Sequence, residues 1–214
     1  MTEVDGKNRI DKERIAKAAV NRAFKLAKAG KKEEADGLYR IAIEAGIASG
    51  TPNARSIVAY AAVRLAKNIM TTGKIDEANK LCRVAIREDS TSSTSYGRET
   101  VASAYFYLAI SFMLEGKIDK ANKSYRMAIR EGSASGTAHG RERAAYAASN
   151  LANTLWQTGK IEKAKKSDRI AIMEGNASAT PLGKYIAANC SLELERNSNE
   201  DPNEPYCMGG FAPI

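Results

Sequence analysis

The chain repeats itself every 43 residues, and this period constrains the fold more than any other feature of its sequence. Four stretches align without gaps: AGKKEEADGLYRIAIEAG, TGKIDEANKLCRVAIRED, EGKIDKANKSYRMAIREG and TGKIEKAKKSDRIAIMEG. One glycine recurs in register in all four, at Gly30, Gly73, Gly116 and Gly159. A period of this length indicates a supersecondary unit that stacks on copies of itself.

Each unit has the pattern of a helical hairpin. In the second unit, apolar side chains at Ile75, Ala78, Cys82 and Ala85 fall on one face of a helix. A second segment with the same periodicity precedes the glycine of each unit, which is expected to end the first helix in a left-handed conformation. The second helix is expected to stop at Gly46, Asp89, Gly132 and Gly175, which also recur every 43 residues.

These patterns predict an all-α fold, a right-handed α-solenoid of four helical hairpins with an additional C-terminal helix. The predicted units are 9–45, 54–88, 98–131 and 141–174, followed by a terminal helix at 182–196. We expect residues 1–8 to be a flexible N-terminus and residues 197–214 to be an acidic and apolar tail. A hairpin cannot bury its apolar stripe alone, so the units must stack.

The repeat resembles the tetratricopeptide repeat. Leu-Ala pairs at 65–66, 108–109 and 151–152 stand where that family has Leu-Gly, and Ala78 and Ala85 stand at its two small packing positions. The usual period is shorter by nine residues, and the long repeats of kinesin light chain are most similar. The resemblance covers residues 10 to 196 and implies a protein-binding scaffold.

The same resemblance implies a concave groove lined by the first helix of each hairpin, which receives an extended peptide or a helix of a partner protein. Aromatic, aliphatic and polar side chains in the matching register suit such a site. The candidate groove residues are Phe24, Tyr60, Lys67, Phe106, Ile110, Met113, Tyr146, Asn153 and Trp156.

The connections between units also repeat, as ASGTP, TSSTS, ASGTA and ASATP. They lack the Gly-Lys-Ser/Thr ending of a nucleotide-binding loop, so we interpret their hydroxyl groups as helix caps. Basic residues recur near the start of each first helix, where the helix dipole disfavours a cation. Neighbouring acids could compensate, and the alternative is a row of anion sites for a polyanion or nucleic acid. This basic row comprises Lys12, Arg55, Arg98, Arg141 and Lys184.

The sequence argues against catalysis and cofactors. The single histidine and three widely spaced cysteines provide no metal cluster, and no catalytic pair or nucleotide fingerprint survives the comparison between repeats. We therefore predict no enzyme activity, no metal and no cofactor. The N-terminal stretch MTEVDGKNRIDKERI has no apolar core of a signal peptide, and no apolar run approaches a membrane span, so we expect a cytoplasmic protein without membrane contact.

A third hypothesis is self-association. The terminal helix has no second helix to complete its hairpin, and Tyr185, Ile186 and Leu192 spread apolar surface around it. The tail is either disordered or a ligand segment that docks on its own groove or on a neighbouring copy. Contacts from head to tail between solenoids would propagate as an oligomer or filament.

Overall fold

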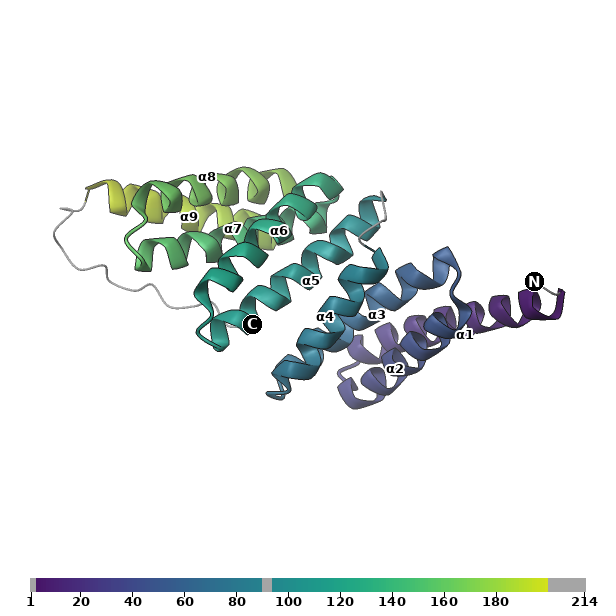
Figure 1. Cartoon of the computed structure of the whole chain (residues 1–214). Helices are drawn as coiled ribbons and strands as arrows, with labels where there is room; N and C mark the ends of the chain where they lie inside the picture. The colour runs from purple at the N-terminus through teal and green to yellow at the C-terminus, as the bar shows by residue number, and fades with distance from the viewer. Residues whose placement is uncertain (1–2, 90–93, 200–214) are drawn as a thin grey trace.

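The computed structural model describes residues 3–89 and 94–199, and within these ranges every regular element is an α-helix (Figure 1). The first helices of the hairpins are α1 (Glu3–Lys28), α3 (Pro52–Met70), α5 (Ser95–Leu114) and α7 (Ala138–Gln157). The second helices are α2 (Lys32–Ser49), α4 (Ile75–Asp89), α6 (Ile118–Ser135) and α8 (Ile161–Ser178), and α9 (Pro181–Asn199) follows them. Each helix packs on its neighbours in the chain, which confirms the predicted all-α solenoid.

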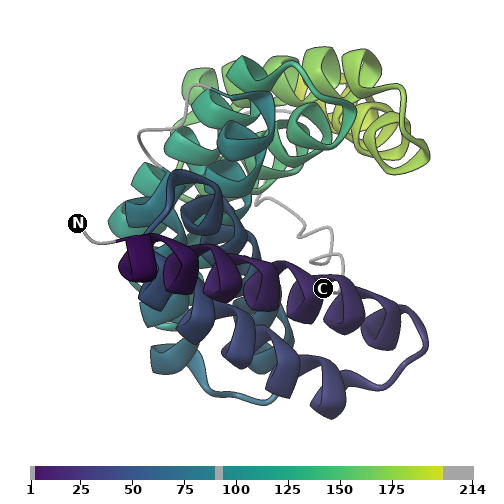
Figure 2. The same ribbon diagram turned by 90° about the vertical axis from the view of Figure 1, so that its right-hand side faces the viewer.

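The stacked hairpins follow a curved path. Figure 2 shows the helices wound in an arc, with α1 and α2 at one end and α8 and α9 at the other. Consecutive first helices also contact one another directly, α1 with α3, α3 with α5, α5 with α7 and α7 with α9. They therefore form one continuous layer along the arc.

Threonines of the connections start the first helices. The side chains of Thr51, Thr137 and Thr180 each accept a hydrogen bond from a backbone N–H three residues later, at 3.2, 2.9 and 3.0 Å. This satisfies one of the open donors at each helix start. The hydroxyl-rich connections thus act as caps, and they are short because the second helices run on to Ser49, Ser135 and Ser178.

The two sets of recurring glycines have different roles. Gly30, Gly73, Gly116 and Gly159 have φ between 66° and 80° in the turn inside each hairpin, as predicted. The expectation that Gly46, Gly132 and Gly175 end the second helices is wrong, because all three lie inside helices. The left-handed residues after those helices are Gly50, Gly136 and Ala179.

The glycines inside the second helices allow close approach of the next hairpin. A Cβ atom added to Gly132 would lie 2.5 Å from the carbonyl oxygen of Gly140 at the start of α7. The same construction at Gly175 places its Cβ 2.4 Å from the carbonyl oxygen of Gly183 in α9. These distances are too short for any side chain, so glycine is required at these two contacts between hairpins.

The core consists mainly of small residues in register. Alanines at two positions of each second helix are at most 1% exposed, and they let the helices of a hairpin pack closely. These alanines are Ala35, Ala78, Ala121 and Ala164, then Ala42, Ala85, Ala128 and Ala171. Larger side chains fill the remaining space, and Tyr39, Tyr125 and Leu65 are among the most completely buried.

At the two ends of the described solenoid, charged residues stand at positions where other units bury apolar residues. Arg22 is exposed in α1, at the position where Leu65 and Leu108 are buried in later units. Glu195 is exposed in α9, at the position where earlier units bury an alanine such as Ala152. Among the described residues no hairpin covers these faces, and charged side chains suit a face in contact with water.

α1 begins at Glu3, so a helix occupies residues 3–8, where we expected a flexible segment. α9 buries Ile186 and Cys190 against α7 and α8. Tyr185 and Leu192 remain 59% and 60% exposed. Residues 200–214, which include most of the predicted tail, lie outside the described residues.

Candidate functional site

Three adjoining pockets lie along the layer of first helices, between α1 and α7. One cavity of about 670 Å³ brings Phe24 of α1 and Lys67 of α3 together with His139 of α7. Because the helices α1 and α7 belong to hairpins three units apart, a shared cavity places the first helices on the inner side of the curve. This inner face, called here the concave groove, is the candidate site.

The first pocket along the groove is largely apolar. It has a volume of about 310 Å³ and lies between α1, α3 and α5, where Val20, Phe24, Ile57, Tyr60 and Tyr96 contribute to its walls. The rings of Tyr60 and Tyr96 lie with their centroids 5.9 Å apart. A pocket with these walls suits an aliphatic or aromatic side chain of a ligand.

The second pocket is cationic. It has a volume of about 240 Å³ between α3, α5 and α7, and its lining includes Arg64, Lys67, His139 and Arg143. The two pockets share Tyr60 and Tyr96. A ligand that spans the shared wall would therefore meet an apolar and a positively charged subsite in succession.

Aromatic rings hold the two arginines in place. Nε of Arg64 donates a hydrogen bond of 3.0 Å to the hydroxyl of Tyr60, and its guanidinium lies 5.0 Å from the centre of that ring. The guanidinium of Arg143 lies 4.6 Å from the centre of the Phe106 ring. Cation–π contacts of this kind orient a charge without neutralising it.

The groove contains six basic side chains, called here the groove cations: Lys17, Lys28, Lys32, Arg64, Lys67 and Arg143. Within residues 3–89 and 94–199, none of them forms an ion pair. The acids in the pocket linings are Glu99 and Glu142, and Glu99 accepts a 2.6 Å hydrogen bond from Thr137. The groove therefore carries an excess of positive charge.

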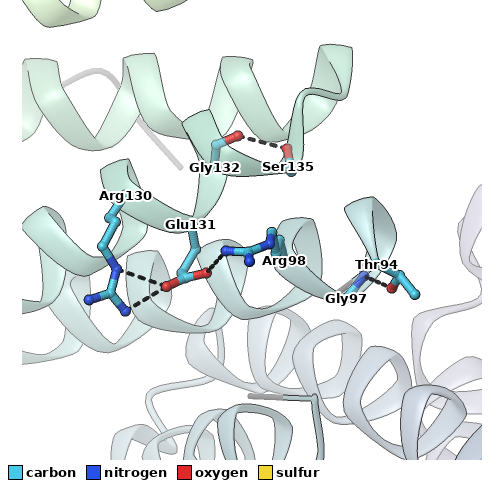
Figure 3. Close-up of polar contacts among 7 residues, drawn as sticks. All are labelled: Thr94, Gly97, Arg98, Arg130, Glu131, Gly132 and Ser135. Carbon is cyan, nitrogen blue, oxygen red and sulfur yellow. Dashed lines mark hydrogen bonds and ion pairs between the residues drawn. The ribbon is translucent and has the colours of Figure 1, made fainter. Parts of the chain in front are cut away.

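The basic row at the helix starts behaves differently. Arg98 pairs with Glu131 at 3.3 Å, and Figure 3 shows that Arg130 approaches the same carboxylate. Arg141 pairs with Glu174 at 3.2 Å in the next hairpin. The compensating acids, Glu131 and Glu174, are thus near the end of the second helix of the same hairpin and are not neighbours of the arginines in sequence.

Two of the candidate groove residues must be corrected. Phe106 is 2% exposed and lies beneath Arg143, while Trp156 is 7% exposed and donates a 2.9 Å hydrogen bond from Nε1 to Asp168. Both belong to the core, because the first helices turn these positions toward neighbouring helices. Ile110, Met113, Tyr146 and Asn153 are partly buried and do not line the three pockets.

Of the candidate groove residues, Phe24, Tyr60 and Lys67 line the three pockets. Sequence reasoning missed Arg64 and Arg143. Both stand at positions that do not repeat, since Arg64 aligns with Tyr107 and Arg143 aligns with Ile57. Departures from the repeat were therefore the signal that could have identified them.

The side chains that commonly bind metals do not cluster in the described part of the chain. No three His, Cys, Asp or Glu residues gather there in a way that could hold a metal ion. Among the same residues, none of the helices combines the length and the apolar character needed to cross a lipid bilayer.

Comparisons with known proteins agree with the repeat architecture. A family model described as "Tetratrico peptide repeat" matches residues 16–96. The crystal structure of BtubC (BKLC) from P. vanneervenii is similar, with a TM-score of 0.55 and 16% sequence identity over 100% of both chains. At this identity the likeness concerns the fold alone. No curated protein matches the sequence. The family match covers residues 16–96, and the 43-residue hairpins that continue to α9 give the described chain the architecture of a tetratricopeptide-repeat-like protein.

Proposed function

We propose that the chain is a non-enzymatic scaffold whose concave groove binds an extended segment of a partner protein. The segment carries acidic side chains for the cationic pocket and an aliphatic or aromatic side chain for the apolar pocket. Proteins of the repeat family generally bind other proteins. The proposal specifies the concave groove as the binding face and a segment with acidic and apolar side chains as the ligand.

The unpaired state of the groove cations supports the proposal most directly. Arg64 and Arg143 lie over aromatic rings, and Lys28 has its Nζ 4.7 Å from the centre of the Phe24 ring. These contacts leave the charges available to a ligand. Carboxylates of a bound segment would supply charge-assisted hydrogen bonds.

The basic row at the starts of the first helices supports the polyanion alternative less well than the groove supports peptide binding. Arg98 and Arg141, two of the five members of the basic row, are ion-paired within their own hairpins. Self-association has some support in the exposed Tyr185 and Leu192 of α9, which stand beside charged residues of the terminal face. Neither alternative provides a pocket with both apolar and charged walls.

The test is a selection from a random-peptide library with the purified full chain, followed by fluorescence anisotropy on the selected peptides. We expect enrichment of acidic residues next to an aromatic or aliphatic residue. The double variant Arg64→Gln, Lys67→Gln should bind the selected peptides at least about tenfold more weakly, because it removes two charges from the groove.

The matched control is Lys74→Gln, Lys80→Gln, which removes two exposed charges outside the pockets and should leave affinity nearly unchanged. Selection of peptides without acidic residues would contradict the proposal. Equal affinity of the two double variants would contradict it as well.

A further inference from the structure

We propose that residues 200–214 of the chain itself occupy the concave groove and compete with a partner for it. This inference rests on the groove of the proposed function and adds a ligand that the chain carries. The segment EDPNEPYCMGGFAPI lies outside the described residues. Its sequence combines the acidic and the apolar side chains that the two pockets suit.

Charge complementarity is the first argument. The segment carries Glu200, Asp201 and Glu204 and contains no lysine or arginine. The groove has six cations without ion pairs and two acids, one of which already accepts a hydrogen bond. An acidic segment tethered to the same molecule is therefore attracted to this face.

The order of side chains is the second argument. A segment that leaves α9 and follows the layer of first helices meets the cationic pocket of α3, α5 and α7 before the apolar pocket of α1, α3 and α5. Its own sequence presents acids first and then Tyr206 and Phe211. The order along the chain thus matches the order along the groove.

The length of the segment is sufficient. Packed helices are about 8–10 Å apart, so α7 lies about 10 Å and α3 about 30 Å to the side of α9. Asn199 also lies 13 residues beyond Ile186, the α9 position that aligns with Arg143, which adds about 20 Å along the helix axis. An extended chain advances about 3.3 Å per residue, which brings Glu204 up to roughly 16 Å and Phe211 up to roughly 40 Å from Asn199, and the side chains of Glu204 and Arg143 span the remaining distance of several Å. Pro202, Pro205 and Pro213 favour such an extended conformation.

Cys207 allows the proposal to be tested on the unmodified chain. Cys82 and Cys190 are 0% and 1% exposed, and burial raises the pKa of both thiols to about 12, so they react slowly with thiol reagents. A nitroxide label is attached to Cys207, and mass spectrometry checks that one label is present. Amide signals of the full chain are then recorded by NMR with the nitroxide oxidised and reduced.

We expect the label to broaden amide signals around Tyr60, Tyr96 and Lys67 and to leave those around Lys80 and Lys123, on the second helices, unchanged. The triple variant Glu200→Gln, Asp201→Asn, Glu204→Gln should lose most of this broadening. A matched triple variant, Glu33→Gln, Asp119→Asn, Glu162→Gln, removes three exposed acids from second helices and should retain it. Uniform or absent broadening in the wild-type chain would overturn the proposal. Broadening that rises with protein concentration would overturn it in favour of docking on a second copy.

A binding measurement separates this inference from the proposed function. The probe is a fluorescent synthetic peptide with the sequence of residues 200–214, titrated into the full chain and into the triple variant of the segment. A tethered segment has an effective concentration of the order of millimolar, so the probe should bind the variant about tenfold more tightly than the wild type. Equal affinities would overturn self-occupation. If library peptides still bind through Arg64 and Lys67 in that case, the scaffold function stands by itself.

Discussion

Asp168 is the residue that departs most from the repeat. Tyr39, Cys82 and Tyr125 are buried at the same position in the earlier units, and Asp168 is also fully buried. It accepts the indole N–H of Trp156 at 2.9 Å, and Cys190 and Glu193 of α9 also interact with it. Burial raises the pKa of Asp168 to about 6, although the Trp156 hydrogen bond opposes the shift. A carboxylate therefore takes the place of an apolar side chain where the terminal helix docks.

We expect the contribution of Asp168 to the free energy of unfolding to fall as the pH rises from about 4 to about 6. The folded chain binds the Asp168 proton more tightly than the unfolded chain in this range, so raising the pH favours unfolding. Asp168→Asn keeps the hydrogen bond from Trp156 without a buried charge and should stabilise the chain at pH 7.5 by about 1–3 kcal/mol. Little difference from the wild type is expected near pH 4.

The measurement is urea unfolding of both chains at several pH values. Asp119→Asn on α6 is the control, because this acid is exposed and its replacement should not create the same pH dependence. A stability difference between wild type and Asp168→Asn that stays constant from pH 4 to pH 7.5 would contradict the expectation.

Among the helices, the contacts between hairpins depend on glycine inside the second helices. Propensity alone argues against glycine there, since it costs about 1 kcal/mol relative to alanine in a helix interior. The structure shows the compensation, because Gly132 and Gly175 lie against the backbone of the following helix. The same residue type thus marks a chain turn at Gly116 and a close contact at Gly132.

Gly132→Ala should destabilise the chain by about 1–3 kcal/mol, because its Cβ would lie 2.5 Å from the Gly140 carbonyl oxygen and 3.0 Å from the Ala144 Cβ. Gly37→Ala is the matched control. Gly37 lies inside α2 with no atom within 4 Å of an added Cβ, so this change should stabilise the chain by about 0.5–1 kcal/mol. Thermal unfolding followed by circular dichroism measures both, and shifts of the same sign would refute the proposed contact.

Over the molecule as a whole, the outer faces of the two terminal described helices carry charged residues at positions that other units bury. Arg22 and Lys25 of α1 are exposed at positions where later units bury Leu65 and Ser111. Ile15 on the same face of α1 is 53% exposed. The first hairpin is therefore folded like the later units, but the outer face of its first helix carries exposed charges.

Arg22→Leu combined with Lys25→Ser restores the interior pattern on this outer face. We expect the variant to self-associate, because the new leucine joins Ile15 in a larger exposed apolar surface that no charge interrupts. Light scattering should show a mass that rises with protein concentration.

The control for this cap variant is Lys74→Leu combined with Lys80→Ser, which makes the same replacements at two exposed lysines away from the outer face of α1. It should have the mass of the wild-type chain at every concentration. A cap variant that also matches the wild-type mass at all concentrations would show that Arg22 and Lys25 do not limit association through this face.

Local periodicity that recurs four times was sufficient to predict the repeat, the helical hairpins and the all-α solenoid. The capping threonines and the turn glycines could be predicted too, because both act within a few residues of their own position. The side of each first helix that faces the groove became visible only in the folded molecule. Phe106 and Trp156 are core residues there, and Arg64 and Arg143 line the cationic pocket. The physical reason is that curvature and helix rotation arise from packing between units, and a repeat in sequence does not specify how far one hairpin rotates on the next.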